Sequence, residues 1–188
     1  QAQARKKAAE EREQGDQEAL GVLKQAKEKK DIDGILAVMT QHRDSTEVQE
    51  KGCVYLGNVT LYNDATRRTI AEKGGIEAAF RAMTQHSHHE QVQQYGCYMM
   101  YYMVDCESVR PAIREGKAVM DAARNNFPNN DNIKTYLDYV YGEMKAPEEA
   151  SQVLEEAIKK TDIDGILAVM AQHRDSTEVQ EKGCYALG

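Results

Sequence analysis

The sequence predicts an all-α protein made of repeated helical units, and three observations lead to this prediction. The 188 residues include only three prolines and few β-branched runs, whereas a many-stranded β fold needs frequent turn signals. Apolar residues recur at helical spacing through most of the chain. Two segments, 31–53 and 162–184, have the same sequence except that Ala171 replaces Thr40. Internal repetition of this kind is typical of a solenoid.

The repeat length follows from aligning these two segments with two more divergent copies between them. The first apolar stripe of each copy begins at Ile32, Ile76, Val119 and Ile163, in steps of about 43 or 44 residues. We therefore expect about four repeats after a charged N-terminal helical extension, with the third repeat degenerate and the fourth truncated at its C-terminus. The expected ranges are 1–15 for the extension and 16–58, 59–104, 105–146 and 147–188 for the repeats.

Each copy carries two apolar helical stripes. The first copy places Ile32, Ile35, Leu36 and Met39 on one helix face, and the second and fourth copies repeat this pattern. The third copy has Val119, Ala122 and Ala123, with Asn126 where the methionine belongs. Second stripes follow at 48–56, 92–100, 133–141 and 179–187, and in three copies they contain a glycine that we expect to allow close helix packing. Shorter helices at 16–29, 64–73, 107–115 and 148–160 complete three helices per repeat.

Composition restricts the classes of partner. The formal net charge is −7, from 24 Lys and Arg against 31 Asp and Glu, and an acidic surface binds nucleic acid poorly. No apolar stretch approaches the roughly 18–20 residues that cross a bilayer, so we expect neither a nucleic-acid nor a membrane partner. An acidic body favours a protein or peptide of basic character, and an ordinary solvated surface is the alternative.

The four cysteines, Cys53, Cys97, Cys106 and Cys184, do not have the density of a disulfide framework. Their recurrence in the repeats indicates one buried helix position that is used repeatedly. We predict free core thiols in a reducing compartment, which is the cytoplasm or the nucleus.

Recognisable catalytic chemistry is lacking in the sequence. We find no Ser/His/Asp or Cys/His constellation and no phosphate-binding glycine loop, so we expect a non-enzyme with no catalytic residue, no cofactor and no metal. His86, His88 and His89 share one loop and are residue types that ligate metals, but we interpret the loop as solvated. We interpret Met99, Met100 and Met103 as core residues, with a flexible binding patch as the alternative.

The repeats resemble the armadillo family. The resemblance is carried by the sequence IAEKGGI at 70–76 and by residues 47–58, where Glu47-Val48-Gln49 leads to Gly52 and on to Leu56-Gly57-Asn58. It covers about residues 16–188 and is best in the second copy. It implies an all-α, right-handed α-solenoid of about four three-helix armadillo-type repeats. HEAT repeats, with two helices, and tetratricopeptide repeats, with about 34 residues, fit less well.

Family members that bind nuclear-localisation peptides carry Trp-x-x-x-Asn on the third helix. In this chain the tryptophan position holds Val54, Tyr98, Tyr139 and Tyr185, and the asparagine position holds Asn58, Tyr102 and Glu143. Since only Asn58 is retained, the resemblance implies a groove and not the import-receptor function.

A second face of the third helices follows from helical geometry alone. Positions 47, 51, 54 and 58, with their equivalents, lie on a face separate from the buried stripe. Six of the ten tyrosines lie there, and tyrosine is typical of interfaces. A packing role between neighbouring third helices is the alternative. The candidate groove residues are Lys51, Val54, Asn58, Tyr95, Tyr98, Tyr102, Tyr136, Tyr139, Glu143, Lys182 and Tyr185.

These observations lead to one main functional hypothesis. We expect a non-enzymatic protein–protein interaction scaffold that binds an extended peptide or a partner helix along a concave tyrosine-rich groove. One alternative is a regulatory armadillo segment of a larger multidomain enzyme or cytoskeletal protein, and another is a self-assembling repeat array. The stripe of Val179, Gly183 and Leu187 is as apolar as an internal one, so we also expect weak head-to-tail self-association through the repeat ends.

Overall fold

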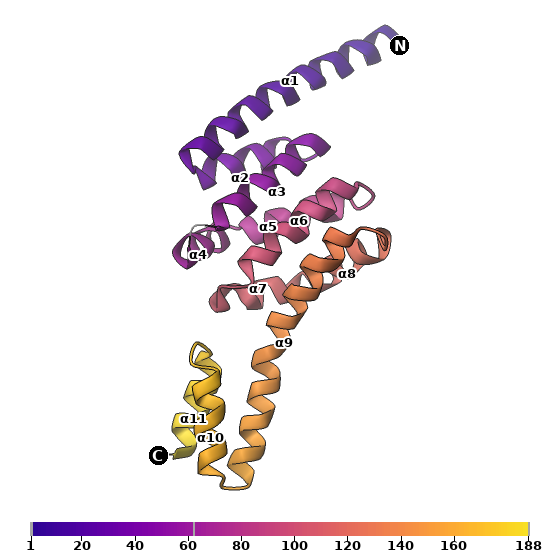
Figure 1. The fold of residues 1–188 in the computed structure, drawn as a ribbon. Helices are drawn as coiled ribbons and strands as arrows, with labels where there is room; N and C mark the ends of the chain where they lie inside the picture. Colours follow the sequence, from indigo (N-terminus) through magenta and orange to yellow (C-terminus); the bar gives the residue numbers. More distant parts are fainter. Residues whose placement is uncertain (1, 62, 188) are drawn as a thin grey trace. The chain divides into compact units, whose positions relative to one another are not determined.

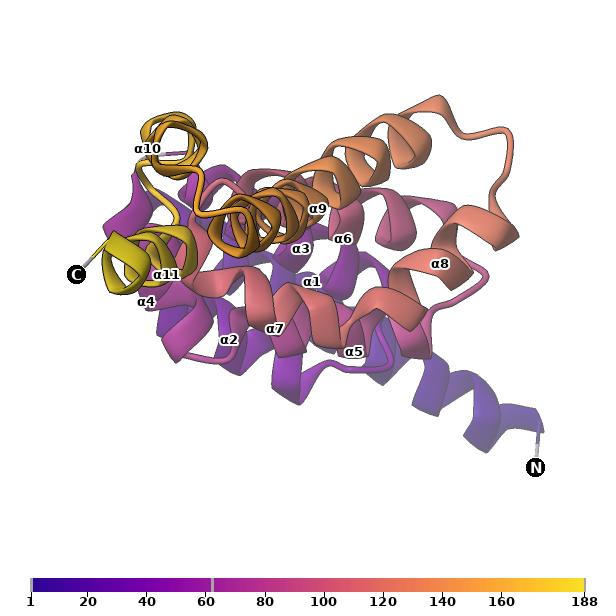
Figure 2. The same cartoon turned by 90° about the horizontal axis from the view of Figure 1, so that it is seen from below.

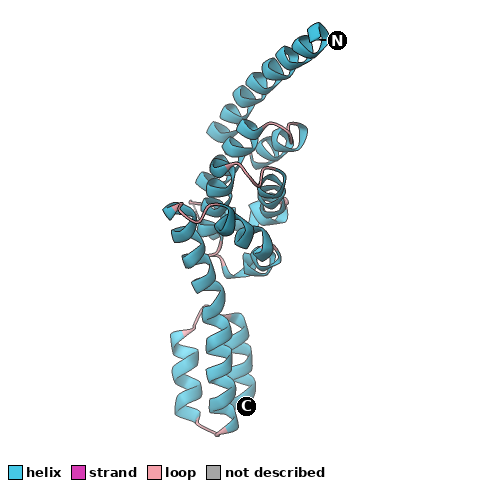
Figure 3. Cartoon of the chain, turned by 90° about the vertical axis from the view of Figure 1, so that its right-hand side faces the viewer, coloured by secondary structure: helices cyan, strands magenta, loops and turns pink. Residues whose placement is uncertain are grey.

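The computed structural model describes residues 2–61 and 63–187, with the side chains of residues 2 and 146–148 left aside. Within these residues the chain forms α-helices and one 3-10 helix, joined by short loops, and no strand (Figure 3). The all-α prediction is therefore confirmed. The chain divides into two compact units, Gln1–Leu137 and Asp138–Gly188, and the division lies inside one helix.

The described residues of the first unit form nine helical elements and the start of a tenth (Figure 1). They are α1 (Ala2–Lys29), α2 (Ile32–Gln41), α3 (Thr46–Thr60), α4 (Asp64–Glu72), α5 (Gly75–Gln85), α6 (Glu90–Met103), η1 (Glu107–Val109), α7 (Arg110–Glu115), α8 (Lys117–Asn126) and the first turns of α9 (Asp131–Lys159). The second unit holds the rest of α9 together with α10 (Ile163–Gln172) and α11 (Thr177–Leu187).

Two helices are longer than the sequence pattern predicted. Residues 2–15 of the charged extension and the expected helix 16–29 share one helix, α1, because this stretch is rich in alanine, glutamate, glutamine and lysine, which favour helix. The expected helices 133–141 and 148–160 are both part of α9, whose backbone continues through Pro147 although proline supplies no N–H. The third and fourth copies therefore have no loop between them.

In the first unit, equivalent helices of successive copies lie side by side. In Figure 2, α2, α5 and α8 lie along one side of the unit, while α3, α6 and the first turns of α9 lie along the other. The most extensive packing between two helices joins α3 to α6. This arrangement gathers the tyrosine-bearing helices on one side.

The core of the first unit consists of the predicted stripes, with one shift. Val48, Leu56, Val92 and Met100 have no exposed surface, as their spacing predicts. Met99 and Met103 are equally buried, which confirms them as core residues. In the third copy the prediction holds for Ala123 and is wrong for Val119 and Ala122. The buried residues there are Met120 and Ala123, because the helix turns Val119 to the edge of the core and Ala122 to solvent.

A glutamine clamp joins the second and third helices in three of the four copies. The Gln49 amide donates hydrogen bonds to the carbonyl oxygens of Met39 and His42, each at 2.9 Å. These oxygens lie at the end of α2 and have no partner within that helix. Gln93 and Gln180 make the same pair of bonds in the second and fourth copies. In the third copy the equivalent residue is the exposed Lys134.

The recurring glycine lets the same two helices approach closely, as its position predicted. A methyl group added to Gly52 would overlap the Met39 side chain, and Gly96 and Gly183 stand in the same relation to Met83 and Met170. In the third copy, Asn126 replaces the methionine and the buried Leu137 replaces the glycine. Asn126 instead donates a 3.1 Å hydrogen bond to the Ser87 carbonyl of the preceding copy.

Three of the four cysteines match the prediction of free core thiols. Cys53, Cys97 and Cys106 are buried and unpaired. Burial raises the pKa of Cys53 and the pKa of Cys97 to about 12. For Cys184 the prediction of burial is wrong. This thiol is free but exposed, because the face of α11 that carries it has no covering helix in the second unit.

The second unit has a small core of its own between α9, α10 and α11. Its buried members are Ala150, Leu154, Ala157, Ile166, Val169 and Val179. Asp162 caps α10 by accepting a 2.9 Å hydrogen bond from the Gly165 N–H, as Asp31 caps α2 through Gly34. The fourth copy therefore repeats the local structure of the first.

Candidate functional site

Four tyrosines from α6 and α9 form a closed ring of aromatic contacts in the first unit, which we call the tyrosine cluster. Tyr98 lies edge-on to Tyr102, with ring centroids 5.0 Å apart, and to Tyr136 at 5.7 Å. Tyr101 completes the ring with centroid distances of 4.9 Å to Tyr102 and 5.4 Å to Tyr136. Edge-to-face pairs in this range add about 0.5–1.5 kcal/mol beyond the buried area. All four side chains are half-buried, so each also presents surface to solvent.

One member of the cluster is also fixed to α3. The Tyr98 hydroxyl donates a 3.0 Å hydrogen bond to the Asn58 side-chain oxygen. The ring lies against Gly57, where any Cβ atom would overlap it. Tyr98 therefore packs between third helices, as the alternative interpretation of the tyrosine face proposed, while it still holds the other rings in place.

Burial sets the ionisation of the cluster. Desolvation, followed by the neighbouring Tyr102 and Tyr136, raises the pKa of Tyr98. Desolvation is likewise the main cause that raises the pKa of Tyr136. The hydroxyl groups of these two residues therefore stay protonated at neutral pH and remain hydrogen-bond donors.

Charged groups flank the cluster on α3. Lys51 donates a 2.9 Å hydrogen bond to Glu50, which is the main cause that raises the pKa of Lys51. Nearby, the Lys27 ammonium lies 4.9 Å from the centre of the Tyr55 ring, a cation–π contact. Glu47, in the first turn of α3, is exposed, so this helix carries both signs of charge.

The structure brings together four of the predicted groove residues, Asn58, Tyr98, Tyr102 and Tyr136, through the contacts above. Lys51, Val54 and Tyr95 are half-buried on the same helices, α3 and α6. In the second unit, Tyr139 and Glu143 lie on α9, and Tyr185 on α11 is 92% exposed. Lys182 bonds to Ser151 and Glu155 of α9 and to Glu178, so it fastens α11 to α9.

The sequence pattern missed one member of the cluster. Tyr101 lies outside the face defined by positions 91, 95, 98 and 102, but it touches both Tyr102 and Tyr136. Its spacing of three residues from Tyr98 places the two side chains on neighbouring parts of the helix surface. That spacing was the signal in the sequence from which Tyr101 could have been assigned to the cluster.

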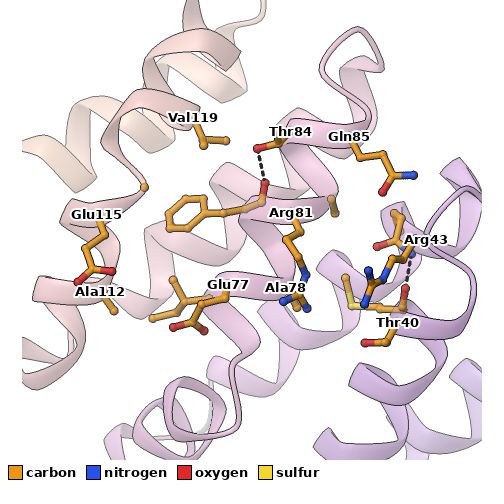
Figure 4. A pocket seen from close by; sticks show the side chains of 16 residues that line it. Thr40, Arg43, Glu77, Ala78, Arg81, Thr84, Gln85, Ala112, Glu115 and Val119 are labelled. Atoms are coloured by element: carbon orange, nitrogen blue, oxygen red, sulfur yellow. Dashed lines mark hydrogen bonds between the residues drawn. The ribbon is translucent and has the colours of Figure 1, made fainter.

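A concave region lies on the side of the first unit that carries α2, α5 and α8. It is a hollow of about 440 Å³ beside α5, and its apolar lining residues include Ile76 and Phe80. Figure 4 shows the side chains that line it. Its rim carries Arg43, Arg81, Glu77 and Glu115, so the two guanidinium groups are balanced by two carboxylates. The lining of the hollow therefore carries both signs of charge.

The histidine loop makes structural contacts. The His86 Nε2–H donates a 2.8 Å hydrogen bond to the Arg43 carbonyl, which leaves Nδ1 to accept one from Thr46 Oγ1 at 3.3 Å. Over the described residues, no group of three or more His, Cys, Asp or Glu side chains could hold a metal ion. Within the same residues, no helix combines the length and the apolar character needed to cross a membrane.

Comparisons of the chain with protein-family models, with curated proteins and with solved structures each gave no match.

Proposed function

We propose that this protein is a non-enzymatic scaffold for protein–protein interaction, and that the tyrosine cluster is the centre of its binding surface. The observation that carries the proposal is the ring of four half-buried tyrosines on α6 and α9. Rings held by one another lose little conformational entropy on binding, and tyrosine combines apolar area with a hydroxyl donor. Such preorganised aromatic groups are typical of binding hot spots.

The proposed ligand is an extended peptide or a partner helix with basic character. The chain has a formal net charge of −7, and α3, which contacts the cluster through Gly57 and Asn58, also carries Glu47 and Glu50. Basic side chains gain from this field, and their stems can stack on tyrosine rings through cation–π contacts. Lys27 already makes such a contact with Tyr55 within the chain.

We further propose an armadillo-type, right-handed α-solenoid as the architecture. The recurring glutamine clamp and glycine–methionine contact support it, since they repeat at the period of the sequence. The free thiols of Cys53, Cys97, Cys106 and Cys184 support a reducing compartment, the cytoplasm or the nucleus.

The test compares the chain with the double variant Tyr102→Ala, Tyr136→Ala. Neither change alters the net charge, so non-specific attraction between an acidic protein and a basic peptide stays the same. The probes are fluorescent peptides of matched length with Lys/Arg-rich, Asp/Glu-rich or Ser/Gly-rich composition. We expect the basic peptides to bind the chain, and the double variant to lose about tenfold or more in affinity, as loss of an aromatic hot spot does.

The control variant, Tyr102→Phe with Tyr136→Phe, keeps the rings and removes only the hydroxyl groups. It should retain most of the binding if the ring surface carries it. Equal affinity of the chain and the alanine variant for every peptide would contradict the proposal, provided that hydrogen exchange shows an intact α6.

A further inference from the structure

Equivalent apolar side chains in the first and fourth copies differ in their exposure to solvent, although the two copies have nearly the same sequence. In the second unit, Ile163 is 57% exposed, Leu167 49% and Leu187 40%. The equivalent Ile32 and Leu36 of the first copy are half-buried, and Leu56 has no exposed surface. The sequences that carry these side chains are nearly identical, so the difference comes from what covers them.

In the first unit, the cover is the segment from α4 to α6. The Lys73 ammonium donates to both carboxylate oxygens of Asp33, at 2.8 and 2.6 Å. Gln85 donates a 2.7 Å hydrogen bond to Asp44, and His86 bonds to Arg43 and Thr46. In this unit α6 packs on α3, which carries Leu56, and α5 packs on α2, which carries Ile32 and Leu36.

The second unit retains the groups that make the polar contacts just described. Asp164, Asp175, Thr177 and the Arg174 carbonyl stand where the first copy has Asp33, Asp44, Thr46 and Arg43. The backbone that presents them is also the same. The residue that caps the start of the helix has φ −81° and ψ 90° at Asp31, and φ −85° and ψ 87° at Asp162. At the other end, the values are −111° and 45° at His42, and −117° and 49° at His173.

We propose that the exposed face of α10 and α11 is a docking surface for a helical repeat with the chemistry of residues 64–103. The partner carries a lysine at the end of its first helix and a Gln-His pair at the end of its second. Its third helix lies along α11, as α6 lies along α3. The carboxylates of Asp164 and Asp175 receive the ammonium and amide groups, and the partner covers Ile163, Leu167 and Leu187.

The N-terminal end of a second copy fits this surface less well. It offers Lys29, Gln41 and His42 at the positions of Lys73, Gln85 and His86. However, the His42 Nδ1–H already donates a 3.1 Å hydrogen bond to Asp16 of its own α1. Arg12 of α1 also lies 3.8 Å from Asp44. The helix α1 therefore already contacts the loop that follows α2, through which a second copy would have to bind.

The experiment supplies the partner from the chain itself. A second copy of residues 58–106 is appended after residue 188, which continues the register of the first copy. The readout is the labelling rate of Cys184 by an aromatic disulfide reagent, followed by peptide mass spectrometry. Cys184 is exposed and its equivalent, Cys53, is buried. We expect the Cys184 rate to fall by about tenfold or more, towards that of Cys53.

The matched control carries an appended segment of the same composition in scrambled order, and its Cys184 should label as fast as in the unextended chain. A further variant, Asp164→Lys with Asp175→Lys, should restore part of the labelling in the extended chain. Unchanged labelling after addition of the native segment would overturn the proposal, whether or not that segment is helical.

Self-association is the other decisive outcome. If the unextended chain gains mass with concentration in sedimentation, and Cys184 becomes protected in parallel, the occupant is a second copy and the proposal is wrong. Neither result depends on the tyrosine cluster. If the docking proposal fails, the peptide-binding test of the proposed function is therefore unaffected.

Discussion

The first and fourth copies of the repeat place almost the same residues in two environments. Towards the helix that precedes them, α1 or α9, the two copies are alike: Ile35 and Ile166 are 0% and 3% exposed, and Val48 and Val179 are both fully buried. On the opposite side they differ, since Leu56 is buried and Leu187 is exposed. The sequence of a repeat therefore determines its inner packing, whereas its neighbour determines whether the other side is core or surface.

The largest expected difference between the copies concerns these two leucines. Leu56→Ala should destabilise the first unit by about 2–5 kcal/mol, because it leaves a cavity in a closed core. Leu187→Ala should cost the second unit less than about 1 kcal/mol, because its side chain is already partly in water. Since the chain has two units, native-state hydrogen exchange in α3 and in α11 measures each effect separately. Similar losses in both helices would show that α11 is covered in solution.

A smaller difference is expected for the glutamine clamp. Gln49 is 4% exposed, so Gln49→Ala leaves the carbonyls of Met39 and His42 with little access to water, at a cost of about 1–3 kcal/mol. Gln180 is half-buried, and Gln180→Ala lets water replace the amide, so about 1 kcal/mol or less should be lost. Urea unfolding followed by hydrogen exchange of each unit gives both values.

Lys134→Ala, at the equivalent position of the third copy, is the control and should change stability by less than about 0.5 kcal/mol. A cost at Gln180 equal to that at Gln49 would contradict the comparison.

Periodicity predicted the parts of the fold that depend on local sequence. It predicted helices at each apolar stripe, the buried positions Val48 and Leu56, and the glycine that lets neighbouring helices pack closely. All of these follow from side-chain spacing along one helix. The continuity of α9 was not predicted, because a proline in the sequence indicates a boundary more often than an uninterrupted helix.

The candidate site was predicted in part. Helical geometry placed Tyr98 and Tyr102 on one face, and the structure brings these two rings into contact. Tyr136 joins them from α9, and that contact depends on how neighbouring helices pack, which spacing along one helix does not specify. The exposure of Cys184 has the same origin: its own helix repeats that of Cys53, but the covering helix is not part of its sequence.

The smallest expected difference isolates a single ion pair. Asp33 and Asp164 occupy the first turn of α2 and α10, so each carboxylate interacts equally with its helix dipole. Only Asp33 meets Lys73, and its side chain is 72% exposed. Asp33→Asn should therefore cost about 0.2–1 kcal/mol more than Asp164→Asn, which is the range of exposed ion pairs. Hydrogen exchange of α2 and α10 measures both losses. At about 1 M salt the Debye length falls to about 3 Å, so the extra loss of stability in Asp33→Asn should largely vanish. Any loss of stability that both variants share reports the interaction with the helix dipole. An excess that persists at high salt would mean that the Asp33 carboxylate stabilises the first unit through hydrogen-bond geometry more than through charge.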